Sequence, residues 1–105
     1  MRAGRLRHSI TIQRLTAARD EFGAPVESWQ DVAPLRAGVE PLTGREFFAA
    51  QQVNSEVSVR IVVRFRSGIL SEMRAVHGAD IYDILAVIPD ARRREMQLLC
   101  KVVNP

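Results

Sequence analysis

The sequence predicts a mainly β protein: a small antiparallel β-barrel of about six to seven short strands with one short α-helix at about residues 44–52. The first observation is that apolar and polar side chains alternate with a period of two in several short segments, which are separated by Gly, Pro or Asp. The second is that one segment carries the signals of a helix start. Many short, closely linked strands suggest a barrel or a sandwich, and we expect the barrel because closure removes edges that promote aggregation.

Three strands are predicted before the helix. Residues 6–15 (LRHSITIQRL) alternate in polarity and are rich in β-branched side chains, which favours a first strand. Residues 16–25 contain Asp, Gly and Pro and are expected to form a long hairpin loop. The chain would return through a second strand at residues 26–33, anchored by Trp29, and continue into a third strand at residues 35–40.

The helix is expected to begin at Gly44. Thr43 and Glu46 have the spacing of a capping box, in which the threonine oxygen accepts one free helix N–H and the glutamate reaches back to another. The helix would continue through REFFAAQQ and end near Asn54. At about nine residues it is too short to be stable alone, so we expect it to dock on the barrel.

Residues 57–69 (VSVRIVVRFRSGI) alternate almost regularly between apolar and basic side chains. A period of two over this length predicts a half-buried strand. The buried face would carry Val57, Val59, Ile61, Val63 and Phe65. The opposite face would carry Ser58, Arg60, Val62, Arg64 and Arg66. This row of arginines fits three uses: a solvated face, a nucleic-acid surface, or a surface that pairs with carboxylates on a neighbouring protein.

The last third of the chain predicts three more strands. Residues 73–77 and 80–88 flank a tight turn at Gly78 and Ala79, as in a β-hairpin. Residues 95–103 (EMQLLCKVV) form the final strand. Its apolar face is expected to carry Met96, Leu98, Cys100 and Val102.

Length and composition limit the classes of protein that the chain can form. Its 105 residues, 47% hydrophobic and 26% charged, predict a single globular domain over residues 1–105 with flexible termini at 1–5 and 104–105. No apolar run is long enough for a membrane helix and the basic start is not a signal peptide, so we expect a soluble protein and no membrane partner. The net charge of +3 is weak evidence for nucleic-acid binding.

The side chains that could support catalysis or bind a metal do not form a recognisable group. His8 and His77 lie in separate strands without metal-ligand spacing, and we interpret each as structural or surface-exposed. Cys100 is the single cysteine, which excludes an internal disulfide, and its strand position favours a buried, inert thiol. Asp20 and Glu21 lack the surroundings of an EF-hand and fit a solvated loop tip. We therefore expect no enzyme activity, no metal and no cofactor.

A small nucleic-acid-binding module is the alternative function. Three strands, a helix and further strands is the order of elements in the OB barrel. OB domains commonly stack bases on aromatic side chains that lie beside basic ones. The arginine face of residues 57–66 carries no aromatic side chain, because Phe65 belongs to the opposite face. This alternative is therefore the weaker one.

Four stretches together resemble one known family. They are GRLRHSITIQR (4–14), RDEFGAPVESWQDV (19–32), VEPLTGREFFAAQQVNSEVSVRIVVRFRSGI (39–69) and MRAVHGADIYDI (73–84). The chain is similar over essentially its whole length to the bacteriophage head-tail joining proteins, also called head completion, head-tail adaptor or stopper proteins. The resemblance implies a small β-barrel with a short helix that assembles as a ring beneath the portal, extends or closes the DNA channel and retains packaged DNA.

The resemblance also gives two sets of candidate residues. In a ring, the arginine face would meet acidic residues of the neighbouring subunit. Candidate interface residues are Arg60, Arg64, Arg66, Asp20 and Glu21, with Glu27, Asp31 and Glu40 as further acidic partners. A loop closes the channel within the family, and we favour the connection 41–56 for this role. Its candidate channel or gating residues are Arg45, Glu46, Phe47, Phe48, Gln51 and Gln52.

The implied partners are the other components of a phage particle. They comprise further copies of the chain in a ring, a portal or adaptor protein, a tail-completion or tail protein, and the double-stranded DNA that passes through the channel. The free chain is expected to be monomeric. It would be made in the bacterial host cytoplasm and become part of the virion or of a prophage-derived particle.

Overall fold

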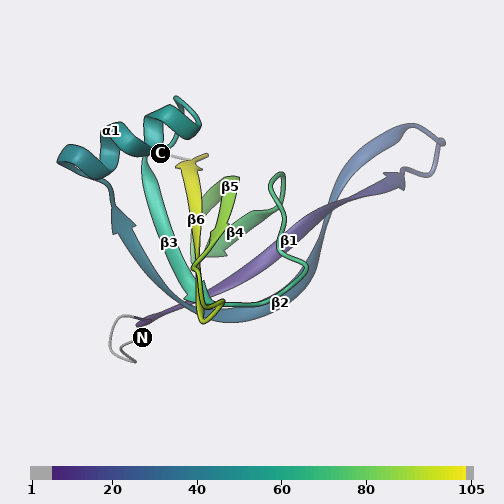
Figure 1. Ribbon diagram of the computed structural model, residues 1–105. Coiled ribbons are helices and arrows are strands. Elements are labelled where there is room, and N and C mark those ends of the chain that lie inside the picture. Colours follow the sequence, from purple (N-terminus) through teal and green to yellow (C-terminus); the bar gives the residue numbers. More distant parts are fainter. Residues whose placement is uncertain (1–5, 104–105) are drawn as a thin grey trace.

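The computed structural model of the protein describes residues 6–103, and the termini expected to be flexible, 1–5 and 104–105, lie outside the described residues. The elements in chain order are β1 (His8–Arg19), β2 (Pro25–Pro41), α1 (Gly44–Val53), β3 (Val59–Arg64), β4 (Arg74–His77), β5 (Asp80–Pro89) and β6 (Glu95–Val102). The described strands form a closed antiparallel barrel in the order β1-β2-β3-β6-β5-β4 (Figure 1). The predicted fold class, a mainly β barrel with one short helix, is confirmed.

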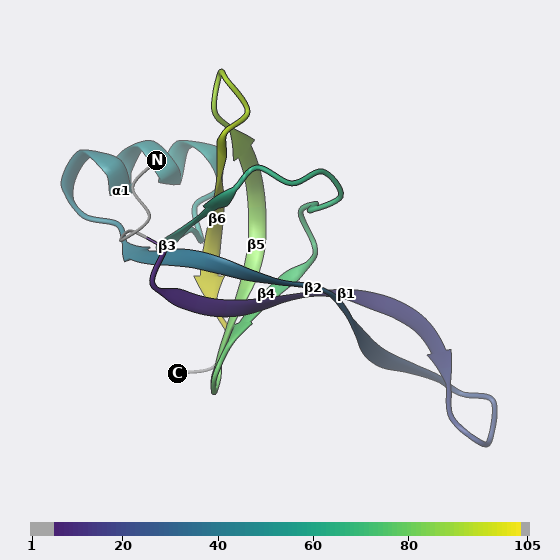
Figure 2. The ribbon, with the colours of Figure 1, turned by 90° about the horizontal axis from the view of Figure 1, so that it is seen from below.

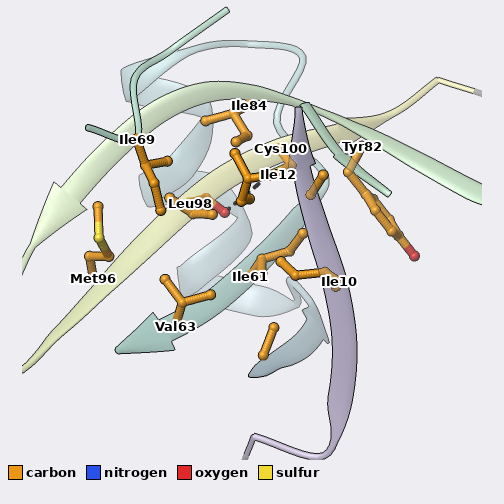
Figure 3. Close-up of a cluster of buried hydrophobic side chains, with 12 residues drawn as sticks. Ile10, Ile12, Ile61, Val63, Ile69, Tyr82, Ile84, Met96, Leu98 and Cys100 are labelled. Atoms are coloured by element: carbon orange, nitrogen blue, oxygen red, sulfur yellow. Dashed lines mark hydrogen bonds between the residues drawn. The ribbon is translucent and has the colours of Figure 1, made fainter. Parts of the chain in front are cut away.

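The barrel interior is filled by apolar side chains from alternate positions of the strands. Figure 3 shows this cluster, to which β1, β3, β5 and β6 contribute labelled side chains. Ile61 and Val63 of β3 are fully buried, as the predicted alternation requires. Leu98 and Cys100 of β6 are likewise inside. Val102, which the sequence places on the same face of β6, is 44% exposed, because the strand ends there.

The second and third predicted strands are one continuous strand, β2. The strands predicted at residues 26–33 and 35–40 left out Pro34, a residue that cannot donate a ladder hydrogen bond. Pro34 instead lies opposite Thr11 of β1, and the pairing of β2 with β3 begins only at Ala37. Pro34 therefore has a paired strand on one side only. Proline is tolerated at such a position because its missing N–H does not interrupt a ladder on both sides. The described chain therefore has six strands, within the predicted six to seven.

The connection predicted at residues 16–25 is also shorter than expected. β1 continues to Arg19 and β2 begins at Pro25, so the turn comprises residues 20–24. β1 pairs with β4 only at residues 11–13, and beyond this point β1 and β2 pair only with each other. Residues 14–30 therefore form a two-stranded ribbon, here called the arm, which projects from the barrel (Figures 1 and 2). The molecule measures 49 × 27 × 25 Å.

The arm is braced where it leaves the barrel. The pairing register shifts between Ile12 and Gln13, a bulge that increases the local twist. Gln13 donates a hydrogen bond of 2.8 Å to Asp31 and accepts one of 2.8 Å from Arg74 of β4. The Arg74 guanidinium also lies 4.0 Å from the centre of the Trp29 ring. Trp29 thus contributes to the base of the arm.

The helix α1 packs on the outside of the barrel, over a second apolar cluster. This cluster contains Leu42, Ala50, Val57 and Leu99, and Phe47 packs against it. Leu99 points outward from β6, between the inward side chains Leu98 and Cys100. The predicted helix is confirmed, and it ends at Val53, one residue later than predicted. Its predicted capping box does not form, because Thr43 makes no side-chain cap hydrogen bond and Glu46 pairs elsewhere.

The remaining predicted strands appear close to their expected positions. The arginine strand is shorter than predicted, because β3 spans Val59–Arg64 within the segment 57–69. Gly78, with φ of 61°, forms the expected turn between β4 and β5, and glycine adopts this left-handed conformation without strain. In the described part of the chain, α1 is too short to span a bilayer and no other helix qualifies either.

Candidate functional site

The arginine row of β3 divides into a paired and an unpaired part. Arg60 meets two carboxylates of its own chain: its Nη2 atom lies 2.7 Å from Oε1 of Glu40 on β2 and 2.9 Å from Oε2 of Glu46 on α1. The Arg60 side chain is only 18% exposed. This network joins the helix to the barrel. It also brings together one predicted interface residue, Arg60, and one predicted gating residue, Glu46.

Replacing Arg60 with Gln is expected to lower the free energy of unfolding by about 1–2 kcal/mol. The reason is that two carboxylates lose their shared cation at a partly buried position. Arg64→Gln, on the same face of the same strand, is the matched control and is expected to change it by less than about 0.5 kcal/mol. Urea denaturation of the two variants measures both values, and equal losses would contradict the network's contribution.

Five exposed arginines gather where β3 ends and the β5–β6 turn begins. This arginine cluster comprises Arg64, Arg66, Arg92, Arg93 and Arg94. The backbone N–H of Phe65 donates to the carbonyl of Arg94 at 3.0 Å, which holds the two segments together. Within residues 6–103 none of the five forms an ion pair, although Arg93 lies 5.9 Å from the Phe65 ring. The cluster is therefore a concentrated positive surface available to an acidic partner.

Sequence reasoning found only part of this cluster. Arg64 and Arg66 were predicted as interface residues from the alternation of their strand. The run RRR at residues 92–94 was not singled out, although three adjacent like charges in a turn are a signal that the sequence contains. What the sequence does not show is that this turn lies beside the end of β3.

The acidic pair Asp20 and Glu21 lies at the tip of the arm. Asp20 has a structural use, because its Oδ1 atom accepts the backbone N–H groups of Phe22 and Ala24, each at 2.9 Å. This is an Asx-type arrangement that fixes the turn. Glu21 is exposed. The arm points away from the barrel, so within one chain the acidic tip does not pair with the arginine cluster (Figure 2).

The predicted gating residues of α1 divide between two faces. Glu46 pairs with Arg60, Phe47 packs on the second apolar cluster, and the Gln51 side-chain amide donates to the carbonyl of Val57. Three others face solvent: Arg45, Phe48 and Gln52. Phe48 is 69% exposed, an unusual position for a large aromatic side chain.

Closure of the barrel brings the two histidines together, which sequence reasoning did not predict. The rings of His8 on β1 and His77 on β4 lie edge to face with centres 4.8 Å apart. No group of three or more potential metal ligands occurs among the described residues.

Cys100 is buried, as predicted, and its burial, with a smaller contribution from Asp83, raises the pKa of the thiol far above its usual range. A high pKa disfavours the reactive thiolate.

The fold and its surfaces define a class of protein. The chain is a small closed β-barrel whose distinctive polar and aromatic side chains lie on exposed outer surfaces: the arginine cluster, the acidic arm tip and the outer face of α1. Such features are typical of a protein that assembles with others.

Comparison with known proteins identifies the family. Residues 1–103 match the model of the phage head completion protein family. The chain is 31% identical over 107 residues to head completion protein gp7 of Enterobacteria phage HK97, covering 96% of each chain. It is 32% identical to a Shigella flexneri 2a protein of known solution structure, with a TM-score of 0.75 and coverage of 97% of this chain and 96% of that one.

A further solved structure shares the fold. It is a chain in the virion of a native gene transfer agent particle, 22% identical, with a TM-score of 0.63 and coverage of 94% of this chain and 96% of that chain. The protein belongs to the phage head completion protein family. Its role is accordingly structural: it is a phage-particle component that completes the head and joins it to the tail. The family that the sequence resembles is confirmed.

Proposed function

We propose that the chain forms a ring between the portal end of a DNA-filled head and the tail, extends or closes the DNA channel and retains the packaged DNA. The observation that carries this proposal is the match to the head completion family over residues 1–103. In this proposal the chain acts as a single domain, is a structural part and not an enzyme, and needs no cofactor. It is made in the host cytoplasm as a monomer and assembles into the particle there.

Ring contacts are proposed to pair the arginine cluster with acidic side chains of the next subunit. Arg64 and Arg66 support this because they are exposed and form no ion pair in the described part of the chain. Asp20 and Glu21 support it because the arm presents them away from their own barrel. Arg60 contributes indirectly, since its charge is already paired with Glu40 and Glu46.

The outer face of α1 is proposed to line or close the channel. Arg45, Phe48 and Gln52 face solvent there, while the opposite side of the helix is docked on the barrel. The remaining partners are a portal or adaptor protein on the head side and a tail-completion or tail protein on the other. Contact with the passing DNA should be weak, because each neutralised phosphate adds affinity through counterion release and would impede sliding.

The test is complementation of a particle-producing strain that lacks this gene. Without the chain, electron microscopy should show separate heads and finished tails, with heads that have lost DNA; the wild-type gene should restore joined particles. Arg64→Glu together with Arg66→Glu should leave heads unjoined, and Phe48→Ser should give joined particles that lose DNA. Fully joined, DNA-filled particles without the gene would overturn the proposal, and steeply salt-dependent DNA binding would then favour a nucleic-acid-binding module.

A further inference from the structure

A trough runs along the outside of the barrel beside α1. Its first part, about 240 Å³, lies between the helix and the outer face of the sheet and has Leu99 at its floor. Its second part, about 200 Å³, continues to Val62 and Glu95 near the β5–β6 turn. Ile88 and Gln97 line both parts, so the two lie side by side. The arginine cluster lies at the far end, since Arg64 pairs with Glu95 in the ladder.

Several groups that line the trough lack a contact partner within the described part of one chain. Val53 and Ile88, which line it, are 55% and 40% exposed. In the second part, the Oε2 atom of Glu95 is buried and has no hydrogen-bond partner in the described structure. Buried acceptors without a partner are rare in folded proteins. An occupant that fits this trough would offer an apolar side chain for the first part and a hydrogen-bond donor for the second.

The tip of the arm has the complementary chemistry. Phe22 is 87% exposed, and a phenylalanine side chain fits the apolar part of the trough. Arg19 donates to the carbonyl of Gly23 at 2.7 Å and retains further N–H donors, which a buried carboxylate oxygen can accept. Asp20 and Glu21 supply the negative charge that the arginine cluster lacks. The tip of the arm, residues 19–24, thus carries an apolar group for the first part of the trough, a donor for the second part and acidic groups for the arginine cluster at its end.

The arm and the trough also lie on opposite sides of the molecule. In both Figure 1 and Figure 2 the arm extends to one side of the barrel and α1, which borders the trough, lies on the other. A chain cannot fill its own trough in this geometry, whereas a second copy placed beside it can. Contacts between two different surfaces of identical chains repeat from copy to copy, and they form a ring when the rotation closes.

We propose that the tip of the arm of one copy inserts into the trough of the next copy. Phe22 fills the apolar part beside α1, Arg19 approaches Glu95, and the acidic pair faces the arginine cluster. The inference rests on the proposed ring, and it assigns the ring a specific contact. It also accounts for the hydrogen-bonded base of the arm at Gln13 and Asp31, because a projecting two-stranded ribbon is only marginally stable alone and must be held in place to reach a neighbour.

Cross-linking in assembled particles tests the contact directly. The single native cysteine, Cys100, is fully buried, so thiol reagents report introduced cysteines without background. The variant Ala24→Cys/Ile88→Cys places one thiol beside Phe22 and one in the trough. Treatment of joined particles with a short bismaleimide should give a ladder of dimers, trimers and larger species. Because a head-to-tail contact involves both positions, each single variant should remain monomeric.

The controls separate this contact from others. Ala24→Cys/Leu70→Cys has its second thiol on an exposed residue outside the trough and should give no ladder. If the double variant forms joined particles but its chains are not cross-linked on treatment, the arm contact is overturned while the proposed function remains intact. Dimers from Ala24→Cys alone would indicate a symmetric contact between tips and would also overturn it. A cross-link from the tip to a portal or tail protein would overturn it in favour of that partner.

A second set of variants tests the same contact if the cysteine variants do not assemble. Phe22→Ser should reduce the number of joined particles at least tenfold without changing the stability of the free chain, because the side chain is 87% exposed. Phe22→Leu keeps an apolar side chain and should retain joining. Normal joining by Phe22→Ser would overturn the inserted role of Phe22.

Discussion

Replacing Leu98 with Ala is expected to lower the free energy of unfolding by about 3–5 kcal/mol, a large part of the roughly 5–15 kcal/mol typical of a domain of this size. Leu98 is fully buried and lies opposite Ile61 on β3 and Val87 on β5. Figure 3 shows it inside the cluster of buried side chains. Truncation would remove its contacts and leave a cavity that a closed barrel cannot easily collapse to fill. Urea denaturation measures the loss.

The chain offers a matched control for this change. Leu15 lies on the arm and is 50% exposed, so Leu15→Ala should cost less than about 1 kcal/mol. If Leu98→Ala does not fold, Ile61→Val provides a smaller deletion in the same cluster, with an expected loss of about 0.5–1.5 kcal/mol. Similar losses for Leu98→Ala and Leu15→Ala would mean that the interior of the barrel does not dominate its stability.

The parts of the fold that follow from local patterns were predictable from the sequence. The alternation around Ile61 identified the strand and its inward face, because a period of two leaves little choice of register, but Val62 on the opposite face is buried as well. The helix was predicted from the capping-box spacing of Thr43 and Glu46, and it does begin at Gly44, although the capping box itself does not form. Local signals are strong where neighbouring residues decide the conformation.

Features that depend on which strands become neighbours were not predictable. Pro34 lies between the two strands predicted at residues 26–33 and 35–40, and only the absence of β3 beside it explains why β2 continues through it. The same limit applies to the candidate site. Glu40 was expected to reach a neighbouring subunit, yet antiparallel pairing of β2 with β3 places it directly opposite Arg60. A single sequence gives the charges of a strand but not the charges of the strand next to it.

The arm illustrates the same point. Residues 16–25 contain Asp20, Gly23 and Pro25, which predicted a loop, but backbone pairing of β1 with β2 continues to Arg19 opposite Pro25. The Thr16 hydroxyl adds a hydrogen bond to the carbonyl of Ser28 across this ladder. The pattern of polar residues is ambiguous here because a two-stranded ribbon outside the barrel has no buried face to impose alternation. Exposure of Phe22 is therefore visible only in the structure.

Above about pH 9 the stability of the protein should fall as pH rises, by up to about 1.4 kcal/mol per pH unit. Burial raises the pKa of the Cys100 thiol in the folded state far above its value in the unfolded chain. Between the two pKa values the unfolded state binds fewer protons than the folded one, so ionisation favours unfolding. The contribution is fully present below the unfolded pKa and is lost progressively above it. Tyr82, whose pKa is also raised by burial, acts in the same direction at higher pH.

Urea denaturation of the wild type and of Cys100→Ala at pH 8, 9 and 10 isolates the thiol. At pH 8 the variant should be less stable, because it loses a buried sulfur atom, but its stability should change less between pH 9 and pH 10. Restricting the comparison to this interval limits the contribution of Tyr82, which ionises later. Parallel curves for the two proteins would show that the thiol is ionised as easily in the folded chain as in the unfolded one, and would contradict its burial among Ile61, Ile84 and Leu98.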